Sequence, residues 1–167
     1  MASTGALDTG IARKLSAALH PLLDSLNGRV VHVGRPLDVV YPATASVEYR
    51  RGTDGLPNGE LAAVVFVAEL CQPRWTPDAI AALAQRLAPD GRVLFAEPVA
   101  GLGPSQLAQR ALDRLATRRW GYGFTRDIPA ELRTAGMTVT SVERIFVDPA
   151  PTVFTFAVGD ARFYERS

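Results

Sequence analysis

The chain has 167 residues, of which 47% are apolar and 21% charged, and its formal net charge at pH 7 is +1. This length suits one domain with a buried core, and the composition excludes a chain that is mainly disordered. The near balance of charge excludes a nucleic-acid binder that works mainly by neutralising phosphates.

The N-terminal third predicts one helix followed by short strands. Apolar residues recur at helical spacing between residues 11 and 26, with Pro21 inside the pattern as a predicted kink. A β-branched apolar run over 30–33 predicts a buried strand that ends at Gly34. Residues 35–59 are rich in proline and glycine, which excludes a long helix but allows a short strand over 46–50.

The middle of the chain alternates between strand and helix. The continuous apolar run 62–68 predicts a strand that is buried on both faces of a parallel sheet. Thr76 with Pro77 after it predicts the start of a helix, whose apolar stripe extends to Leu87. A predicted turn at 89–91 then leads into a second buried strand over 92–96.

The C-terminal third predicts two helices and two strands. A helix over 105–118 has an apolar stripe, made of Leu107, Ala108, Ala111, Leu112 and Leu115. Thr125 or Asp127 caps a short helix that ends at Gly136, and strands follow at about 138–146 and 153–163. This order of elements predicts a mostly parallel sheet closed by an antiparallel pair.

Several classes of site and location are disfavoured by the residues that the chain lacks. One cysteine, Cys71, excludes a disulfide framework and a cysteine-rich zinc site, and we expect a cytoplasmic protein. The two histidines, His20 and His32, do not stand at metal-ligand spacing, so we expect no metal. His32 lies within the predicted strand 30–33, where we expect a partly buried, hydrogen-bonded histidine and not a general base. No apolar run approaches the ~20 residues of a membrane span, and residues 1–10 lack the pattern of a secretion signal.

Three segments carry a resemblance to a known family. They are residues 56–65 (LPNGELAAVV), residues 87–98 (LAPDGRVLFAEP), and residues 120–127 (WGYGFTRD) with 135–137 (AGM). From residue 56 onward the chain resembles the C-terminal half of class I S-adenosylmethionine (SAM)-dependent methyltransferases, especially their small-molecule branch. The resemblance implies one domain with an α/β, trimmed Rossmann-like methyltransferase fold: a mostly parallel sheet of about five to six strands with an antiparallel C-terminal pair.

Within this single domain, 1–167, we distinguish an N-terminal helical segment (1–28), a shortened cofactor half (29–59) and a well-kept C-terminal half (60–167). Residues 29–34 resemble the first strand of the family, but the turn after it has one glycine where the family has several. Only twelve residues, 35–46, separate Gly34 from Val47, whereas a βαβ unit needs roughly 30. At least one βα unit is therefore missing.

Two alignments of the shortened half remain open. In the first, residues 46–48 end the second strand and the third strand with its preceding helix is missing. In the second, residues 47–50 are the third strand and everything between the first strand and this one is deleted. The segment 39–42 resembles the short first crossover of the branch, which favours the first alignment.

The resemblance implies that Gly34, Glu48 and Asp54 are the cofactor-binding residues for S-adenosyl-L-methionine. Gly34 would admit the cofactor, Glu48 would accept the ribose hydroxyls, and Asp54 would lie on the adenine side. Each has a structural alternative: Gly34 as the turn after a strand, Glu48 as a surface acid beside arginines, and Asp54 as a turn former.

A second group of residues is a candidate for contact with a substrate or a partner. Cys71 follows the buried strand at a position that often faces the substrate in the family, although a free cysteine is usually a small buried residue. Trp75 could line the mouth of a pocket or cap the following helix. Trp120, Tyr122 and Arg126 could form an aromatic and cationic lid or an interface, or instead a solvated helix end. No catalytic residue is identified.

Two functions are compatible with these residues. The first is a SAM-dependent methyltransferase acting on a small molecule. The alternative is a non-catalytic accessory or dimerising methyltransferase-like subunit. Because the missing unit would leave a sheet edge open, we also expect a homodimer or a partner subunit to cover that edge.

Overall fold

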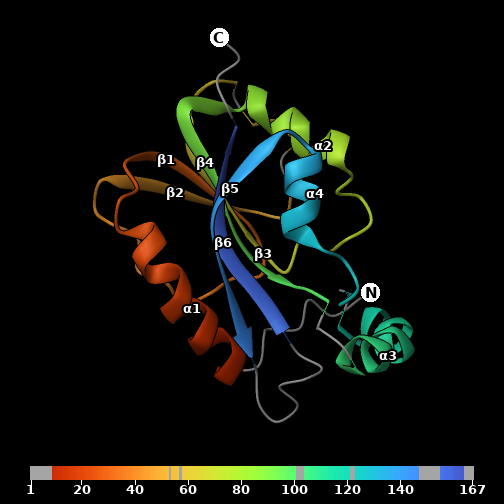
Figure 1. Ribbon diagram of the computed structural model, residues 1–167. Helices are drawn as coiled ribbons and strands as arrows, with labels where there is room; N and C mark the ends of the chain where they lie inside the picture. The colour runs from red at the N-terminus through yellow and green to blue at the C-terminus, as the bar shows by residue number, and fades with distance from the viewer. Residues whose placement is uncertain are drawn as a thin grey trace.

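A six-stranded sheet forms the centre of the computed structural model (Figure 1), which describes residues 9–52, 54–56, 58–100, 104–120, 123–146 and 155–163. The strand order is β2-β1-β3-β4-β6-β5. The strands are β1 (Gly28–Gly34), β2 (Ala45–Arg50), β3 (Leu61–Val67), β4 (Leu87–Pro98), β5 (Met137–Phe146) and β6 (Thr155–Phe163). The first four strands in the order are parallel, and β6 is antiparallel to both β4 and β5. The predicted fold class is confirmed.

Both faces of the sheet are covered, which is why β3 is apolar along its whole length. One apolar cluster joins α1 (Thr9–Leu23) to alternate residues of β1, β3 and β4. The other joins the opposite face to α2 (Pro77–Ala81), the 3-10 helix η1 (Ala82–Gln85) and α4 (Ile128–Thr134). Figure 1 shows α1 on one side of the sheet and α2 and α4 on the other. None of the helices in the described ranges is long and apolar enough to cross a membrane.

The helix starts follow the predicted capping residues. Thr76 caps α2, since its side chain accepts a hydrogen bond from the amide of Ala79. Asp127, and not Thr125, caps α4 by accepting from the amide of Ala130. The helix after Thr76 is shorter than predicted, because the chain changes to the 3-10 helix η1 at Ala82, five residues before β4 begins at Leu87.

Two predictions are wrong in detail. The predicted turn at 89–91 lies inside β4, as an irregular insertion between the pairs Leu61–Leu87 and Ala63–Arg92. The apolar stripe of α3 (Pro104–Trp120) does not face the core: Leu107, Leu112 and Leu115 are 69%, 42% and 62% exposed.

Polar side chains on the opposite side of α3 hold it in this orientation. Gln109 is buried and donates to the carbonyl of Val99, and Asp113 accepts from the amide of Phe124.

The crossover from β1 to β2 has no helix. Residues 35–44 connect the two strands, and β2 pairs directly with β1, with Val30 opposite Val47 and His32 opposite Tyr49. β2 thus lies where the first alignment expects the second strand. Among the described residues no strand pairs with its outer edge.

Candidate functional site

The carboxyl ends of the parallel strands β1, β2, β3 and β4 meet at one edge of the sheet. In open α/β sheets ligands bind at this edge, so the segments that follow these strands are the first place to look for a site. Those segments are residues 34–37, 50–56, 68–75 and 97–99.

The turn after β1 is packed tightly against the end of β3. Gly34 has a φ of +104°, and a Cβ added there would lie 2.3 Å from the carbonyl oxygen of Val67 and 2.9 Å from the Cβ of Glu69. The next amide, that of Arg35, donates to the same carbonyl of Val67 at 3.0 Å. Glycine is therefore required at this position by contact between two strand ends.

His32 lies in the middle of β1 and is 1% exposed. Its Nδ1 lies 2.8 Å from the hydroxyl of Tyr41, and its Nε2 lies 2.8 Å from the carbonyl oxygen of Arg35. Burial lowers the pKa of this histidine, although the bond to Arg35 opposes the shift. This is the buried, hydrogen-bonded histidine that the sequence predicts.

A fully buried carboxylate holds the loop after β3. The two oxygens of Glu97, at the end of β4, accept from the backbone amides of Glu69 at 2.8 Å and Cys71 at 3.1 Å. Burial raises the pKa of Glu97 to about 7, and the backbone hydrogen bonds limit the rise. Burial, followed by the charge of Glu97, also raises the pKa of the Cys71 thiol. Cys71 is therefore a buried thiol that favours its neutral form.

Glu69 makes a second set of contacts within the same loop. Its carboxylate accepts from the Gln72 side chain at 2.9 Å and from the Trp75 indole at 3.0 Å, and it pairs with Arg74. The Trp75 ring also packs edge-on against Phe66, with ring centres 4.9 Å apart. These contacts keep Trp75 largely buried.

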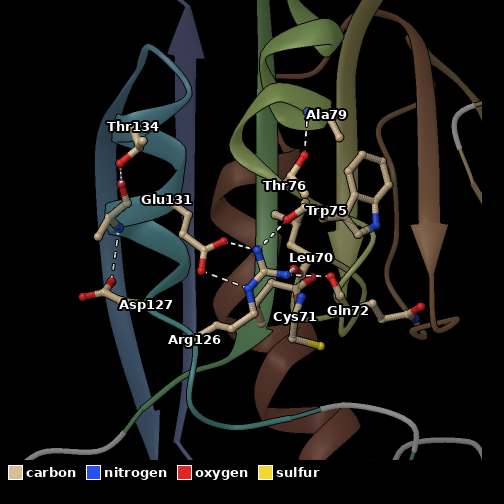
Figure 2. Close-up of polar contacts among 12 residues, drawn as sticks. Leu70, Cys71, Gln72, Trp75, Thr76, Ala79, Arg126, Asp127, Glu131 and Thr134 are labelled. Atoms are coloured by element: carbon tan, nitrogen blue, oxygen red, sulfur yellow. Dashed lines mark hydrogen bonds and ion pairs between the residues drawn. The ribbon is translucent and has the colours of Figure 1, made fainter.

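Arg126 joins this loop to α4, as Figure 2 shows. Its guanidinium donates to the carbonyl oxygens of Leu70 at 2.8 Å, Gln72 at 2.6 Å and Trp75 at 2.5 Å. The same group forms a two-pronged ion pair with Glu131. Arg126 therefore holds the loop after β3 in place through hydrogen bonds to three of its carbonyl groups. All the donors of its guanidinium are used by partners within the protein.

An open cavity of about 320 Å³ lies beside this closed loop. An adjoining hollow of about 440 Å³ shares Gly52, Asp54 and Arg74 with it. We call the two together the arginine groove. Its lining residues are Arg50, Arg51, Gly52, Asp54, Arg74, Trp75, Ala79, Ala82, Leu83 and Arg86.

The structure brings together some of the predicted cofactor residues and separates others. Asp54 lines the arginine groove, whereas Gly34 is packed against Val67 and Glu69. Glu48 lies in the middle of β2, opposite Val31, and not at the end of the strand. Its carboxylate accepts from Arg50 at 2.6 Å and Arg29 at 3.4 Å, and the contact with Arg50 is the main reason that its pKa is lowered.

Three of the predicted substrate or partner residues lie close together, and the side chains of the other two cannot be placed from the described part of the chain. Cys71, Trp75 and Arg126 lie together in and around the loop after β3. The backbone of Trp120 ends α3, but its side chain and the whole of Tyr122 lie outside the described part of the chain. The roles assigned to these residues remain predictions.

Sequence reasoning missed the residues that define the edge. Glu69 and Glu97 each follow an apolar strand run, which is an unusual place for a carboxylate and could have pointed to a buried acceptor. Arg51, Arg74 and Arg86 carry no local signal, because they come from segments that only the fold brings together.

Solved structures of known proteins share this fold. No family model and no curated protein matches the chain. A solved geranyl diphosphate methyltransferase in complex with GPP and sinefungin matches with a TM-score of 0.62 and 10% identity, over 95% of this chain and 79% of that one. The mitomycin 7-O-methyltransferase MmcR matches with a TM-score of 0.55 and 14% identity, over 92% of this chain and 53% of that one. LepI, solved with SAH and a substrate analogue, matches with a TM-score of 0.56 and 11% identity, over 93% of this chain.

The chain spans 41% of LepI and 55% of TnmH, another match, so it corresponds to about half of these proteins. At such low identities the likeness concerns the fold alone. The chain has the fold of small-molecule, SAM-dependent methyltransferases, with a six-stranded sheet and an antiparallel C-terminal pair.

Proposed function

We propose that this chain is a non-catalytic methyltransferase-like protein, which keeps the fold but does not transfer a methyl group from SAM. The observation that carries the proposal is the charge of the arginine groove. Four arginines and one aspartate line it, and Glu48 and Glu69 pair with two of the arginines, which leaves 4 − 1 − 2 = +1 in formal charge. SAM carries a sulfonium cation, so this groove disfavours it.

The end of β2 supports the same conclusion. A carboxylate at this position would accept hydrogen bonds from the hydroxyls of a ribose. Here the strand ends at Arg50, and Arg51 follows it. The one acid within β2, Glu48, is already bonded to Arg29 and Arg50. The residues at this strand end do not fit the ribose of SAM.

A specific observation favours a second candidate, an active SAM-dependent methyltransferase of small molecules. Asp54 lies in the groove just beyond the end of β2, where its carboxylate could take the place of the missing strand-end acid. Among the solved structures of the same fold, LepI and the geranyl diphosphate methyltransferase were each solved with SAM. In this reading Asp54 replaces Glu48 as the ribose acceptor.

Calorimetry with SAM and S-adenosylhomocysteine (SAH) separates the two candidates. For the non-catalytic protein we expect no heat of binding from either ligand at about 1 mM, with a sample that unfolds cooperatively. Binding in the micromolar range that Asp54→Asn weakens about tenfold would overturn the argument from the groove's charge and support the second candidate, which transfer of the methyl group from SAM to an acceptor would then establish. Asp90→Asn is the matched control, because it makes the same change at an exposed acid that does not line the groove.

We also propose that the outer edge of β2 pairs with β2 of a second copy of the chain. In an antiparallel pair centred on Tyr49, that residue would lie opposite its own copy, and Glu48 would lie opposite Arg50 of the partner. Tyr49 is 55% exposed, so the pair would bury aromatic surface and match opposite charges. A non-catalytic, dimerising subunit would use its open strand in this way.

Light scattering tests this pairing. We expect the mass of two chains for the wild type and a weakened dimer for Glu48→Arg, which places like charges opposite each other. The double change Glu48→Arg with Arg50→Glu reverses both charges and should restore the dimer. A monomer at high concentration, or a dimer that ignores both changes, would disprove the pairing.

A further inference from the structure

We infer that the arginine groove binds a small molecule that carries a phosphate or carboxylate group. This inference deepens the proposed function, because it names the class of ligand for the same groove. Arginine is the side chain best suited to planar, two-point recognition of these oxyanions. Four arginines from three separate segments of the chain meet here, at the end of β2, in the loop after β3 and just after η1.

The protein's own carbonyl groups fix three of these guanidinium groups. Arg50 donates to the carbonyl of Asp54 at 3.0 Å, and Arg74 donates to the carbonyl of Arg51 at 2.9 Å. Arg86 donates to the carbonyl of Leu56 and, at 2.6 Å, to the side chain of Asn58. A guanidinium has five N–H donors, so each retains donors for a ligand after these bonds. Preorganised donors lower the cost of binding.

The groove keeps positive charge after its ion pairs are counted. Arg50 is paired with Glu48 and Arg74 with Glu69. Within the described part of the chain, neither Arg51 nor Arg86 is within ion-pair distance of a carboxylate.

Asp54 offsets one of the two positive charges of Arg51 and Arg86, which leaves a net charge of 2 − 1 = +1 in the groove for a ligand to neutralise. Arg51 and Arg86 therefore carry the inference.

The other lining residues indicate what else the ligand contains. Trp75, Ala79 and Leu83 line the cavity of about 320 Å³, a volume in the range of small-molecule sites. An oxyanion at Arg86 would leave the rest of the molecule against this apolar side. The ligand is thus a small organic anion with an apolar or aromatic part.

Calorimetry at low salt with inorganic pyrophosphate and with citrate tests the inference and distinguishes phosphate from carboxylate. We expect a Kd below about 1 mM for at least one probe, and a loss of about tenfold in affinity for Arg51→Ala and for Arg86→Gln. Arg51 is exposed, so its replacement leaves the fold intact. Arg133→Ala is the matched control, because it removes the same charge from the exposed surface of α4.

The outcomes distinguish this inference from the proposed function. No binding of either probe at about 10 mM, or an equal loss in the Arg133→Ala control, would overturn the inference alone. Micromolar binding of SAH would overturn the argument from cofactor fit on which the non-catalytic proposal rests, and competition between SAH and pyrophosphate would place both ligands in the one groove. Binding of a probe without binding of SAH would support both proposals.

Discussion

The two halves of the carboxyl edge of the sheet use their polar residues in opposite ways. On the β3–β4 side, the polar groups of Glu69, Glu97 and Arg126 bond to the protein's own loop. On the β1–β2 side, Arg50 ends β2 and Arg51 follows it, and both line an open groove. One half of the edge is closed by internal hydrogen bonds, and the other is open and positively charged.

This difference shows which half of the edge is available to a ligand. A guanidinium or carboxylate that is saturated by buried partners stabilises a loop, but it offers little to a ligand that must displace those partners. The loop after β3 is such an element. The charge that remains uncompensated lies across the groove, at Arg51 and Arg86. Variants that loosen the closed half should therefore change stability, and variants in the groove should change binding.

The largest expected effect comes from Gly34→Ala, where the end of β1 packs against the closed half. The new Cβ would lie 2.3 Å from the backbone carbonyl of Val67, at a φ of +104° that disfavours any side chain. Because backbone cannot move aside as a flexible side chain can, we expect a loss of about 4 kcal/mol in the free energy of unfolding. Denaturation by urea measures it.

Gly59→Ala is the control for Gly34→Ala. Gly59 has a φ of +69°, but a Cβ there would meet nothing within 4 Å. This variant has the backbone strain without the collision, and we expect it to cost only about 1 kcal/mol. Equal losses for the two glycines would contradict the tight contact between the ends of β1 and β3. A loss of ligand binding in Gly34→Ala would reflect the lost stability and would not identify a cofactor site.

The next effect is on how stability depends on pH. The pKa of Glu97 is about 7 in the folded protein against 4.5 for an ordinary glutamate. The folded state therefore binds more protons than the unfolded state between these values, so this group's contribution to stability falls as pH rises from about 4.5 to 7. At about 1.4 kcal/mol per pKa unit the fall is about 3 kcal/mol.

The comparison of wild type with Glu97→Gln isolates this contribution. His32 acts in the opposite direction, because its lowered pKa makes stability fall as pH drops below about 6.5. That contribution is common to both proteins and cancels in their difference. We expect the stability difference to move by about 3 kcal/mol in favour of the variant between pH 5 and pH 8, measured by urea denaturation. A constant difference would mean that Glu97 does not titrate in this range.

Much of the fold could be predicted because its signals are local. The apolar run of β3, the capping threonine of α2 and the buried His32 all follow from neighbouring residues. The short link between β1 and β2 followed from counting residues, because a helical crossover needs more chain than 35–44 supplies. Local patterns failed at α3, whose leucines face outward, since the side that meets the core was decided by the contacts of Gln109 and Asp113.

The candidate site was less predictable because its geometry depends on contacts that are distant in sequence. Glu48 matches the type of residue that a ribose needs, but the register of β2 on β1 places it opposite Val31 and away from the strand end. Arg126 looked like a residue for an anionic ligand, yet its guanidinium is used by carbonyls more than fifty positions earlier. The arginines of the groove became a group only once the sheet was assembled.

The smallest of the three effects on the closed half is expected from Arg126→Ala. The change leaves the carbonyls of Leu70, Gln72 and Trp75, as well as the carboxylate of Glu131, without their shared donor. Because the Arg126 side chain is 22% exposed, water can replace some of these bonds, and we expect a loss of about 2 kcal/mol by urea denaturation. Arg133→Ala on the same helix should cost less than about 0.5 kcal/mol. If Arg126→Ala cost as little stability as Arg133→Ala but abolished the binding of pyrophosphate, Arg126 would contact a ligand. It would then belong to the open half of the edge and not to the closed half.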